Sequence, residues 1–266
     1  MSEVLPLLAR IADAVAVRPI WDAATGYFAG LGFGRVNYGF TRFASERSIG
    51  NPEDAVFLTT GDDEYARRYF SGGLFARTPA FRWAQANTGA CTWKWVAEAF
   101  ERGALSEAEA AAVRQNAAMG VTAGITVSFP ETSSRAKGAL GMIADPELDH
   151  DAVERVWAER RQEIMAVANM MHLKIVNMPG ANRRRPLTQR QREALEWVAD
   201  GKTTQDVALL MQVSPAMVEK HLRLAREALD VETTAQAVAK AALLNMIFQK
   251  DGGEGPAPAP AATAAR

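Results

Sequence analysis

The sequence has 266 residues, of which 48% are hydrophobic and 23% are charged, and its formal net charge is −1. The length favours two domains, the composition is that of a globular protein, and the near-neutral charge neither requires nor excludes a polyanionic partner. The single cysteine, Cys91, excludes an internal disulfide and fits a reducing, cytoplasmic compartment, and no apolar run is long enough to cross a membrane.

The N-terminal stretch MSEVLPLLARIADAVAV is predicted to form the first helix. Charged residues interrupt its apolar run, which argues against a secretory signal. The apolar residues fall on one helical stripe: Val4, Leu7, Leu8, Ile11 and Val15. The pattern is therefore that of an amphipathic helix.

The remainder of residues 1–176 alternates strand and helix patterns. Strands are predicted over residues 35–43, 55–60, 123–129 and 138–145. Ser106 and Glu109 form a capping box that begins a helix ending near Met119, and a long helix is predicted from Asp149 to Val176. Antiparallel strands with helices at both ends of the segment indicate an α+β fold, an α-β-α sandwich.

The chain is predicted to divide at residues 177–186, where Pro, Gly and three arginines break the helical period as in a solvated linker. Residues 187–250 form the second domain. Residues 180–250 hold 11 Lys+Arg and 8 Asp+Glu, a charge of +3 that leaves the rest of the chain at −4. Residues 251–266 have no apolar period and are predicted to be a disordered tail.

The second domain has an all-α pattern of four helices. Thr188 and Gln191 form a capping box at the first helix, and Gly201 closes that helix. A short helix follows, and the next begins with Ser214 as N-cap and Pro215 at the first helical position. A last helix is predicted over residues 234–248. Two short helices joined by a tight turn are the geometry that places the second helix in the DNA major groove.

The helical period gives the helix that follows Ser214 two faces. Its core face consists of Val218, Leu222, Ala225 and Leu229. Its opposite face consists of Ala216, Lys220, Arg223, Leu224 and Glu227. Lys220 and Arg223 are placed to reach base edges or phosphates, with Lys202 and Arg226 on the flanks. The alternative is an ordinary solvated face, but the Ser-Pro start, the four-helix layout and the basic outward face together favour DNA binding.

Residues 187–241 resemble the helix-turn-helix domain of LuxR-type transcription regulators, and the match includes Leu195, Gly201, Lys202, Val218 and His221. Leu224 stands where the family commonly has Asn. The resemblance implies a homodimer that binds a near-palindromic promoter site, with RNA polymerase as a further candidate partner. The residues assigned to DNA contact are Lys202, Thr203, Thr204, Ser214, Ala216, Lys220, Arg223, Leu224 and Arg226.

Two helices carry candidate dimer contacts. In the long helix these are Met165, Val167, Met170 and Met171, and in the last helix they are Val238, Ala241, Leu244 and Met246. The alternative is that these apolar groups are buried within each subunit.

Quorum-sensing members of this family bind an acyl-homoserine lactone in an α-β-α sandwich. Their ligand signature is an aromatic residue, a Tyr four positions on, an Asp-Pro pair, and a Trp fourteen positions after the proline. The sequence has Tyr65, Tyr69, Thr78-Pro79 and Trp93 at these intervals, and Gly124 matches a later glycine of the family. The resemblance therefore implies that these six residues bind a small signal molecule.

Two positions depart from that signature. Tyr65 stands where the family usually has Trp, and Thr78 stands where it has an Asp that accepts from the ligand amide. A hydrogen bond to a charged group contributes ~1.5–3 kcal/mol against ~0.5–1.5 for a neutral pair. We therefore expect lactone binding to be weaker, on the order of tenfold. The alternative is that the aromatic residues fill a closed core and that the domain serves only dimerisation or protein interaction.

Enzyme and metal sites are not expected. His150, His172 and His221 are scattered and lack Cys or carboxylate partners at ligand spacing. The GLGFG stretch at residues 30–34 precedes a strand instead of a helix, so it is not a phosphate loop, and no nucleophile motif is present. The sequence therefore predicts a regulator without catalytic residues and without a cofactor other than its signal ligand.

Overall fold

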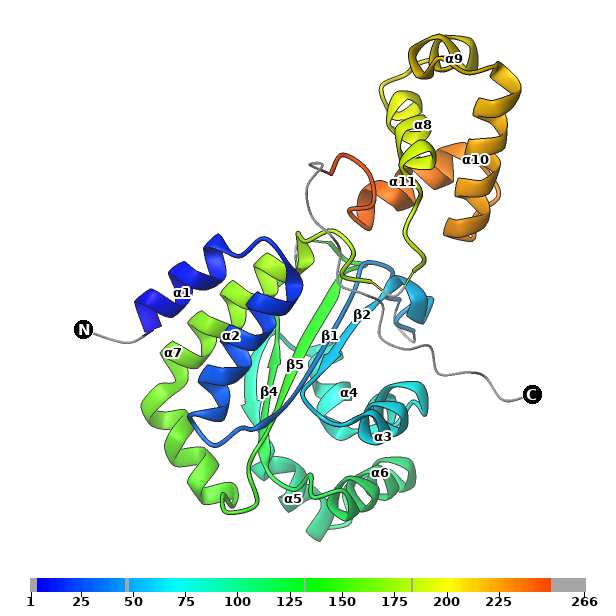
Figure 1. The fold of residues 1–266 in the computed structure, drawn as a ribbon. Helices are drawn as coiled ribbons and strands as arrows, with labels where there is room; N and C mark the ends of the chain where they lie inside the picture. Colours follow the sequence, from blue (N-terminus) through cyan, green and yellow to red (C-terminus); the bar gives the residue numbers. More distant parts are fainter. Residues whose placement is uncertain (1–3, 46–47, 132, 183, 250–266) are drawn as a thin grey trace. The chain divides into compact units, whose positions relative to one another are not determined.

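The structure is a computed structural model that describes residues 4–45, 48–131, 133–182 and 184–249. It divides into two compact units, Met1–Asn51 with Ala55–Val176 and Pro52–Asp54 with Asn177–Arg266 (Figure 1). The tail expected at residues 251–266 lies outside the described residues. The two units are described separately.

A five-stranded antiparallel sheet forms the middle of the first unit, with strand order β2-β1-β5-β4-β3. The strands are β1 (Arg35–Thr41), β2 (Val56–Thr59), β3 (Gly89–Thr92), β4 (Gly124–Ser128) and β5 (Lys137–Ile143). The four predicted strands are therefore confirmed. β3 was not predicted because its sequence, GACT, has no alternating run of β-branched or aromatic residues, and it forms only through its pairing with β4.

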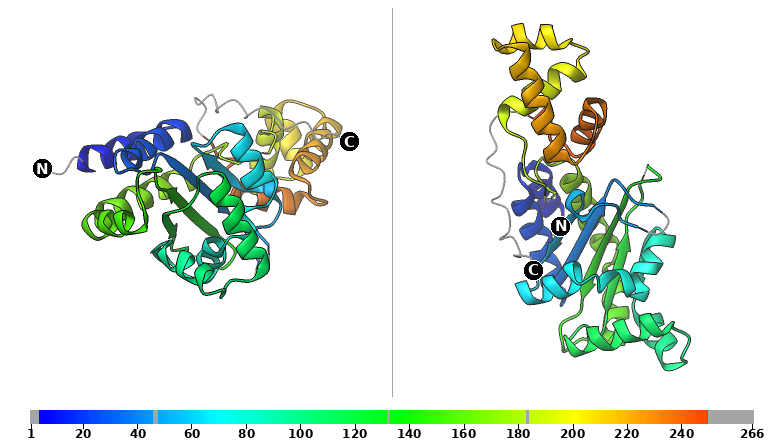
Figure 2. Two further views of the ribbon diagram at one scale, coloured as in Figure 1. Left: turned by 90° about the horizontal axis from the view of Figure 1, so that it is seen from below. Right: turned by 90° about the vertical axis from the view of Figure 1, so that its right-hand side faces the viewer.

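Helices cover both faces of this sheet, so the predicted α-β-α sandwich is confirmed (Figures 1 and 2). The face on one side is covered by α1 (Val4–Asp13), α2 (Val17–Ala29) and α7 (His150–Val176). The other face is covered by α3 (Asp63–Ala66), α4 (Pro79–Ala86), α5 (Lys94–Glu101) and α6 (Glu107–Ala118). The capping box of Ser106 and Glu109 is present at the start of α6.

The first helix is shorter than its predicted stripe. Val4 and Ile11 of α1 are buried, as the amphipathic pattern predicts. Val15 is 88% exposed because α1 ends at Asp13, two residues before it. The assignment of Val15 to the apolar stripe was therefore wrong.

The faces of α7 and α11 (Thr234–Leu243) that were candidate dimer contacts are largely buried within the subunit. In α7, Val167 and Met171 are fully buried. In the second unit, Ala241, Leu244 and Met246 are buried. Met165, Met170 and Val238 are half-buried. Most of these apolar groups therefore belong to the core of their own unit.

The second unit contains α8 (Gln189–Ala199), α9 (Thr204–Met211), α10 (Pro215–Leu229) and α11, which form one cluster of helices (Figure 2). Thr188 and Gln191 form the expected capping box of α8. Gly201 follows the end of α8 with a φ of 80°, a left-handed conformation that glycine adopts without strain. α11 ends at Leu243, five residues earlier than predicted.

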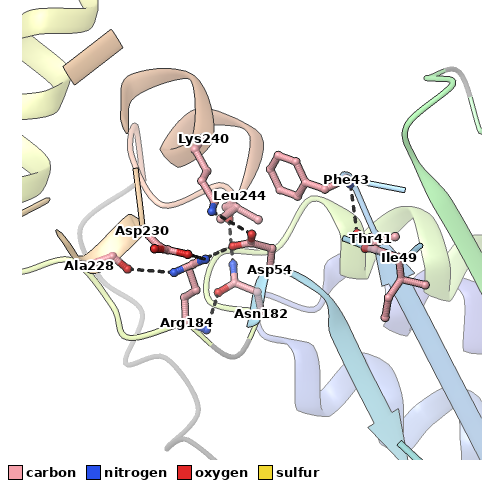
Figure 3. A network of polar contacts seen from close by, with 10 residues as sticks. All are labelled: Thr41, Phe43, Ile49, Asp54, Asn182, Arg184, Ala228, Asp230, Lys240 and Leu244. Carbon is pink, nitrogen blue, oxygen red and sulfur yellow. Dashed lines mark hydrogen bonds and ion pairs between the residues drawn. The ribbon is translucent and has the colours of Figure 1, made fainter. Parts of the chain in front are cut away.

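The second unit also includes Pro52–Asp54, a segment that lies between β1 and β2 in the chain. The Asp54 carboxylate is 3% exposed, forms an ion pair with Arg184, and lies 2.9 Å from the Lys240 ammonium (Figure 3). Arg184 also donates to the carbonyl oxygen of Ala228 at 3.2 Å. Buried charges are tolerated when they are paired in this way.

Among the helices that the structure describes, none is both long enough and apolar enough to cross a membrane.

Candidate functional site

The first unit is hollow between its sheet and the helices α3 to α6. Two adjoining cavities, of about 50 and about 320 Å³, lie there. Both cavities are lined by Asn37, Tyr69, Ala80, Trp93 and Gly141. Because the two cavities share these walls, they adjoin, and we call the two together the sheet hollow.

Small residues at alternate strand positions make the floor of the sheet hollow. Gly39 of β1 and Ala139 and Gly141 of β5 line it. Side chains two residues apart in a strand point to the same face, so this row faces the hollow together. A Cβ atom added at Gly141 would meet nothing nearer than the Trp93 ring, at 3.9 Å. The hollow therefore exists because these positions carry little or no side chain.

The smaller cavity, which we call the polar end for the side chains that line it, is bordered by Asn37, Tyr65, Tyr69 and Thr78. The rings of Tyr65 and Tyr69 stack with centroids 5.4 Å apart and planes 11° apart. The side-chain amide of Asn37 donates to the Tyr65 hydroxyl at 2.6 Å and accepts from Thr59 at 2.7 Å. Burial raises the pKa of both tyrosines, so both remain neutral. The Tyr65 hydroxyl accepts from Asn37, which leaves its hydrogen to donate to a ligand.

Thr78 and Pro79 line the same cavity and begin α4. The Thr78 hydroxyl caps the helix by accepting from the Phe81 amide at 3.2 Å. It also donates to the Phe75 carbonyl oxygen at 2.8 Å. Its hydrogen is therefore committed within the protein, and toward a ligand this hydroxyl serves only as an acceptor.

Trp93 forms part of the wall of both cavities. Its indole N–H donates to the Thr126 hydroxyl at 2.8 Å, which fixes the ring. Gly124 does not line either cavity. A Cβ atom there would lie 2.3 Å from the Met142 carbonyl oxygen and 2.9 Å from the Trp93 ring. The structure thus brings five of the six signature residues to the smaller cavity and places Gly124 behind Trp93.

The larger cavity is mainly apolar. Its aromatic wall includes Phe57, Phe70, Phe75 and Phe81, of which Phe57 and Phe70 have centroids 4.9 Å apart. Phe81 comes from α4 and the other three phenylalanines precede that helix. An apolar space next to a few placed polar groups suits an amphiphilic ligand.

The predicted DNA-contacting residues gather at α9 and α10. The core face of α10 is buried as predicted, at Val218, Leu222, Ala225 and Leu229. Elsewhere on α10, Ala216, Lys220 and Arg223 are exposed, whereas Leu224 and Arg226 are half-buried. The Arg223 guanidinium lies 2.5 Å from the Glu227 carboxylate, and Arg226 donates to the Thr234 hydroxyl at 2.9 Å. Lys220 and Arg223 are therefore the cations that α10 presents to solvent.

The start of α9 supplies the rest of this set. Lys202 is exposed, and Thr203 forms a capping box with Asp206. Thr204 donates to Glu219 of α10 at 3.1 Å, which ties the start of α9 to α10. Ser214 caps α10 by accepting from the Met217 amide. Thr203 and Ser214 therefore have structural roles of their own.

Comparison with known protein families shows to which family the chain belongs. Residues 17–175 match the autoinducer binding domain, and residues 185–241 match the luxR family of bacterial regulatory proteins. The chain belongs to the autoinducer-binding LuxR family of transcription regulators. This is a family of regulators and not of enzymes, as the sequence predicted.

Individual relatives agree with this family. The chain is 31% identical over 118 residues to RpaR of Rhodopseudomonas palustris, a quorum sensing-dependent transcriptional regulator, a match that spans 44% of this chain and 40% of RpaR. It is 21% identical to the transcriptional activator LuxR of Aliivibrio fischeri over 73% of this chain and 76% of LuxR. The crystal structure of Escherichia coli SdiA shares the fold, with a TM-score of 0.55 at 15% identity over 92% of this chain and 98% of SdiA.

Proposed function

We propose that this LuxR-family regulator binds a small amphiphilic signal molecule in the sheet hollow and that the ligand modulates its binding to promoter DNA. The observation that carries the proposal is the hollow itself, in which a mainly apolar cavity of about 320 Å³ adjoins the smaller cavity at Tyr65 and Thr78. It favours ligand binding over a closed aromatic core, because well-packed cores leave few voids larger than a water molecule.

The polar end suits a ligand head group that accepts hydrogen bonds. The Tyr65 hydroxyl offers a donor there, since its own acceptor role is filled by Asn37. The described residues that line the two cavities include no Asp or Glu. We therefore propose that the signal is an acyl-homoserine lactone or a related molecule that does not need a carboxylate to receive an amide N–H.

DNA binding is assigned to the exposed face of α10. Lys220 and Arg223 contact bases or phosphates, and Lys202 and Thr204 support the contact from α9. Two copies of a recognition helix must meet the groove about one turn apart, so we propose that a homodimer binds a near-palindromic site and that RNA polymerase is a further partner.

A ligand screen with a cavity-filling variant tests the proposed site. Gly141→Ala and Gly141→Val place one and then three carbon atoms in the open space beneath Trp93. A ligand at ~100 times its Kd stabilises the wild-type protein by about 2.7 kcal/mol, by mass action. We expect this stabilisation, measured by thermal shift and calorimetry, to fall in Gly141→Ala and to disappear in Gly141→Val.

Gly26→Ala is the matched control, because Gly26 lies in α2 and an added Cβ atom there meets nothing within 4 Å. This variant should respond to ligand as the wild type does. The first ligand to test is any small molecule that co-purifies with the protein from its own host, identified by mass spectrometry. A ligand that stabilises folded Gly141→Val as strongly as the wild type would place binding elsewhere.

A further inference from the structure

The floor of the sheet hollow ends at a lysine. Lys137 is the first residue of β5, and it shares its face with Ala139 and Gly141, which lies beneath Trp93. Four residues of antiparallel strand span ~14 Å, so the Lys137 backbone lies about that far along the floor from Gly141, which lines both cavities. Gln85 and Ser134 line the same cavity as Lys137.

The charge at this position is isolated within the hollow. Among the described residues that line the two cavities, Lys137 is the one with a charged side chain. Its ammonium donates to the carbonyl oxygen of Asn87, the residue that ends α4, at 3.1 Å. Burial lowers the pKa of Lys137, and the Glu131 carboxylate opposes that shift. Lys137 has three donors, so two remain for another partner.

We propose that Lys137 recognises the far end of the bound signal molecule, and that this end carries a carboxylate. The proposal rests on the ligand site described above. In it, the ligand head group meets Tyr65, its apolar chain crosses Gly141 and Ala139, and its terminal carboxylate forms an ion pair with Lys137. Lys137 is then a specificity-determining residue, which selects a ligand long enough to reach from Tyr65 past Gly141 to the end of the floor.

The physical basis is the cost of removing water from a charge. When an apolar chain end covers the Lys137 ammonium, the donors that Asn87 does not use lose water and gain no new partner. A carboxylate at the same place makes a charge-assisted hydrogen bond, which is about twice as strong as a neutral one. The hollow therefore discriminates between two chains of equal length that differ only in their last group.

Matched ligand pairs test this inference. Acyl-homoserine lactones and glycerol monoesters are prepared as chain-length series, each chain ending either in a methyl group or in a carboxylate. Calorimetry on the full chain should show that the wild type prefers the carboxylate-ended member, on the order of tenfold, at the chain length that spans the floor. Lys137→Met, which keeps the length of the side chain and removes its charge, should lose or reverse that preference, while Lys137→Arg should keep it.

Two further outcomes separate this inference from the proposed function. Lys94→Met is the matched control, because Lys94 pairs with Asp151 and lines neither cavity; it should leave the preference unchanged. If the wild type binds methyl-ended ligands as tightly as carboxylate-ended ones, and Lys137→Met does not alter the ratio, Lys137 merely holds the end of α4 and the inference is overturned while the ligand site stands. If no ligand of either series binds and none co-purifies, the proposed function itself fails.

Discussion

Thr78 has two roles at one position. Its hydroxyl holds the start of α4 to the preceding turn through Phe75 and Phe81, and it also lines the polar end of the sheet hollow. Relatives with Asp at this position have an equally good N-cap residue, but a carboxylate has no hydrogen to give to the Phe75 carbonyl oxygen. The substitution therefore changes the chemistry offered to a ligand and the local hydrogen bonding together.

This leads to a prediction for Thr78→Asp combined with Tyr65→Trp. The variant regains a charged acceptor and an indole donor, so its affinity for simple acyl-homoserine lactones should rise on the order of tenfold over the wild type. Calorimetry measures the gain. Urea unfolding must accompany it, because a carboxylate buried without a ligand destabilises the unliganded protein. A folded double variant with no gain for any lactone would contradict the assignment of these residues to the ligand head group.

Cys91 offers a second prediction at this scale. Burial raises the pKa of its thiol to about 11. The reactive thiolate is therefore scarce at neutral pH, and alkylation by iodoacetamide should be slow and should accelerate as the pH rises towards that value. Because the sequence has one cysteine, the rate measured by mass spectrometry reports this position alone. Rapid alkylation of the folded protein at neutral pH would show that the thiol is exposed.

In helix α10, the exposed guanidinium of Arg223 is already paired with a carboxylate. Arg223 contacts Glu227 four residues later, and both side chains are more than half exposed. Such surface pairs contribute little to stability, so DNA phosphates or bases are able to displace Glu227. The ion pair with Glu227 instead determines how readily the Arg223 guanidinium is released to contact DNA.

Substitution of the two members of this ion pair should change DNA affinity in opposite directions. Arg223→Ala should weaken DNA binding by ~1–3 kcal/mol, and Glu227→Gln should strengthen it modestly because the competing carboxylate is gone. Electrophoretic mobility shift on a specific and a random duplex measures both. Equal loss on the two duplexes identifies a phosphate contact, whereas loss only on the specific duplex identifies a base contact. Unchanged binding in Arg223→Ala would contradict the assignment of this face.

Helix caps and strand periodicity were predictable from sequence because they depend on neighbouring residues. Ser106, Thr188 and Ser214 cap the helices expected of them. β3 was not predictable, since its four residues are a strand only through pairing with β4. The hollow was not predictable either. Gly141 reads as an ordinary strand glycine until the structure shows that the space above it is open.

The residues of the candidate site also differ in whether the sequence could predict them. The intervals between Tyr65, Tyr69, Thr78 and Trp93 predicted that these residues lie together, because the family spacing is a property of the sequence, and all four line the smaller cavity. Lys137 and the phenylalanines of the larger cavity come from separate strands and helices, and only the folded sheet brings them to one space. Gly124 matched the family and yet lies behind Trp93, since spacing alone does not distinguish a ligand contact from a support.

The whole molecule combines two units that offer different surfaces to a partner. The first unit supplies a ligand-sized hollow, and the second supplies an exposed basic helix. A sensor must convert ligand binding into a change in DNA affinity, and the size of that change equals the differential affinity of the ligand for the two states. We therefore propose ligand-dependent DNA binding as the property that requires both units.

Footprinting of a near-palindromic promoter site, with and without the identified ligand, tests whether the ligand controls DNA binding by a dimer. The wild type should protect both half-sites, with an affinity that changes when ligand is added, and Gly141→Val should show the same affinity with and without ligand. Gly26→Ala should behave as the wild type. An identical ligand response in wild type and folded Gly141→Val, or protection of a single half-site at saturation, would contradict the account of a dimeric regulator controlled through the sheet hollow.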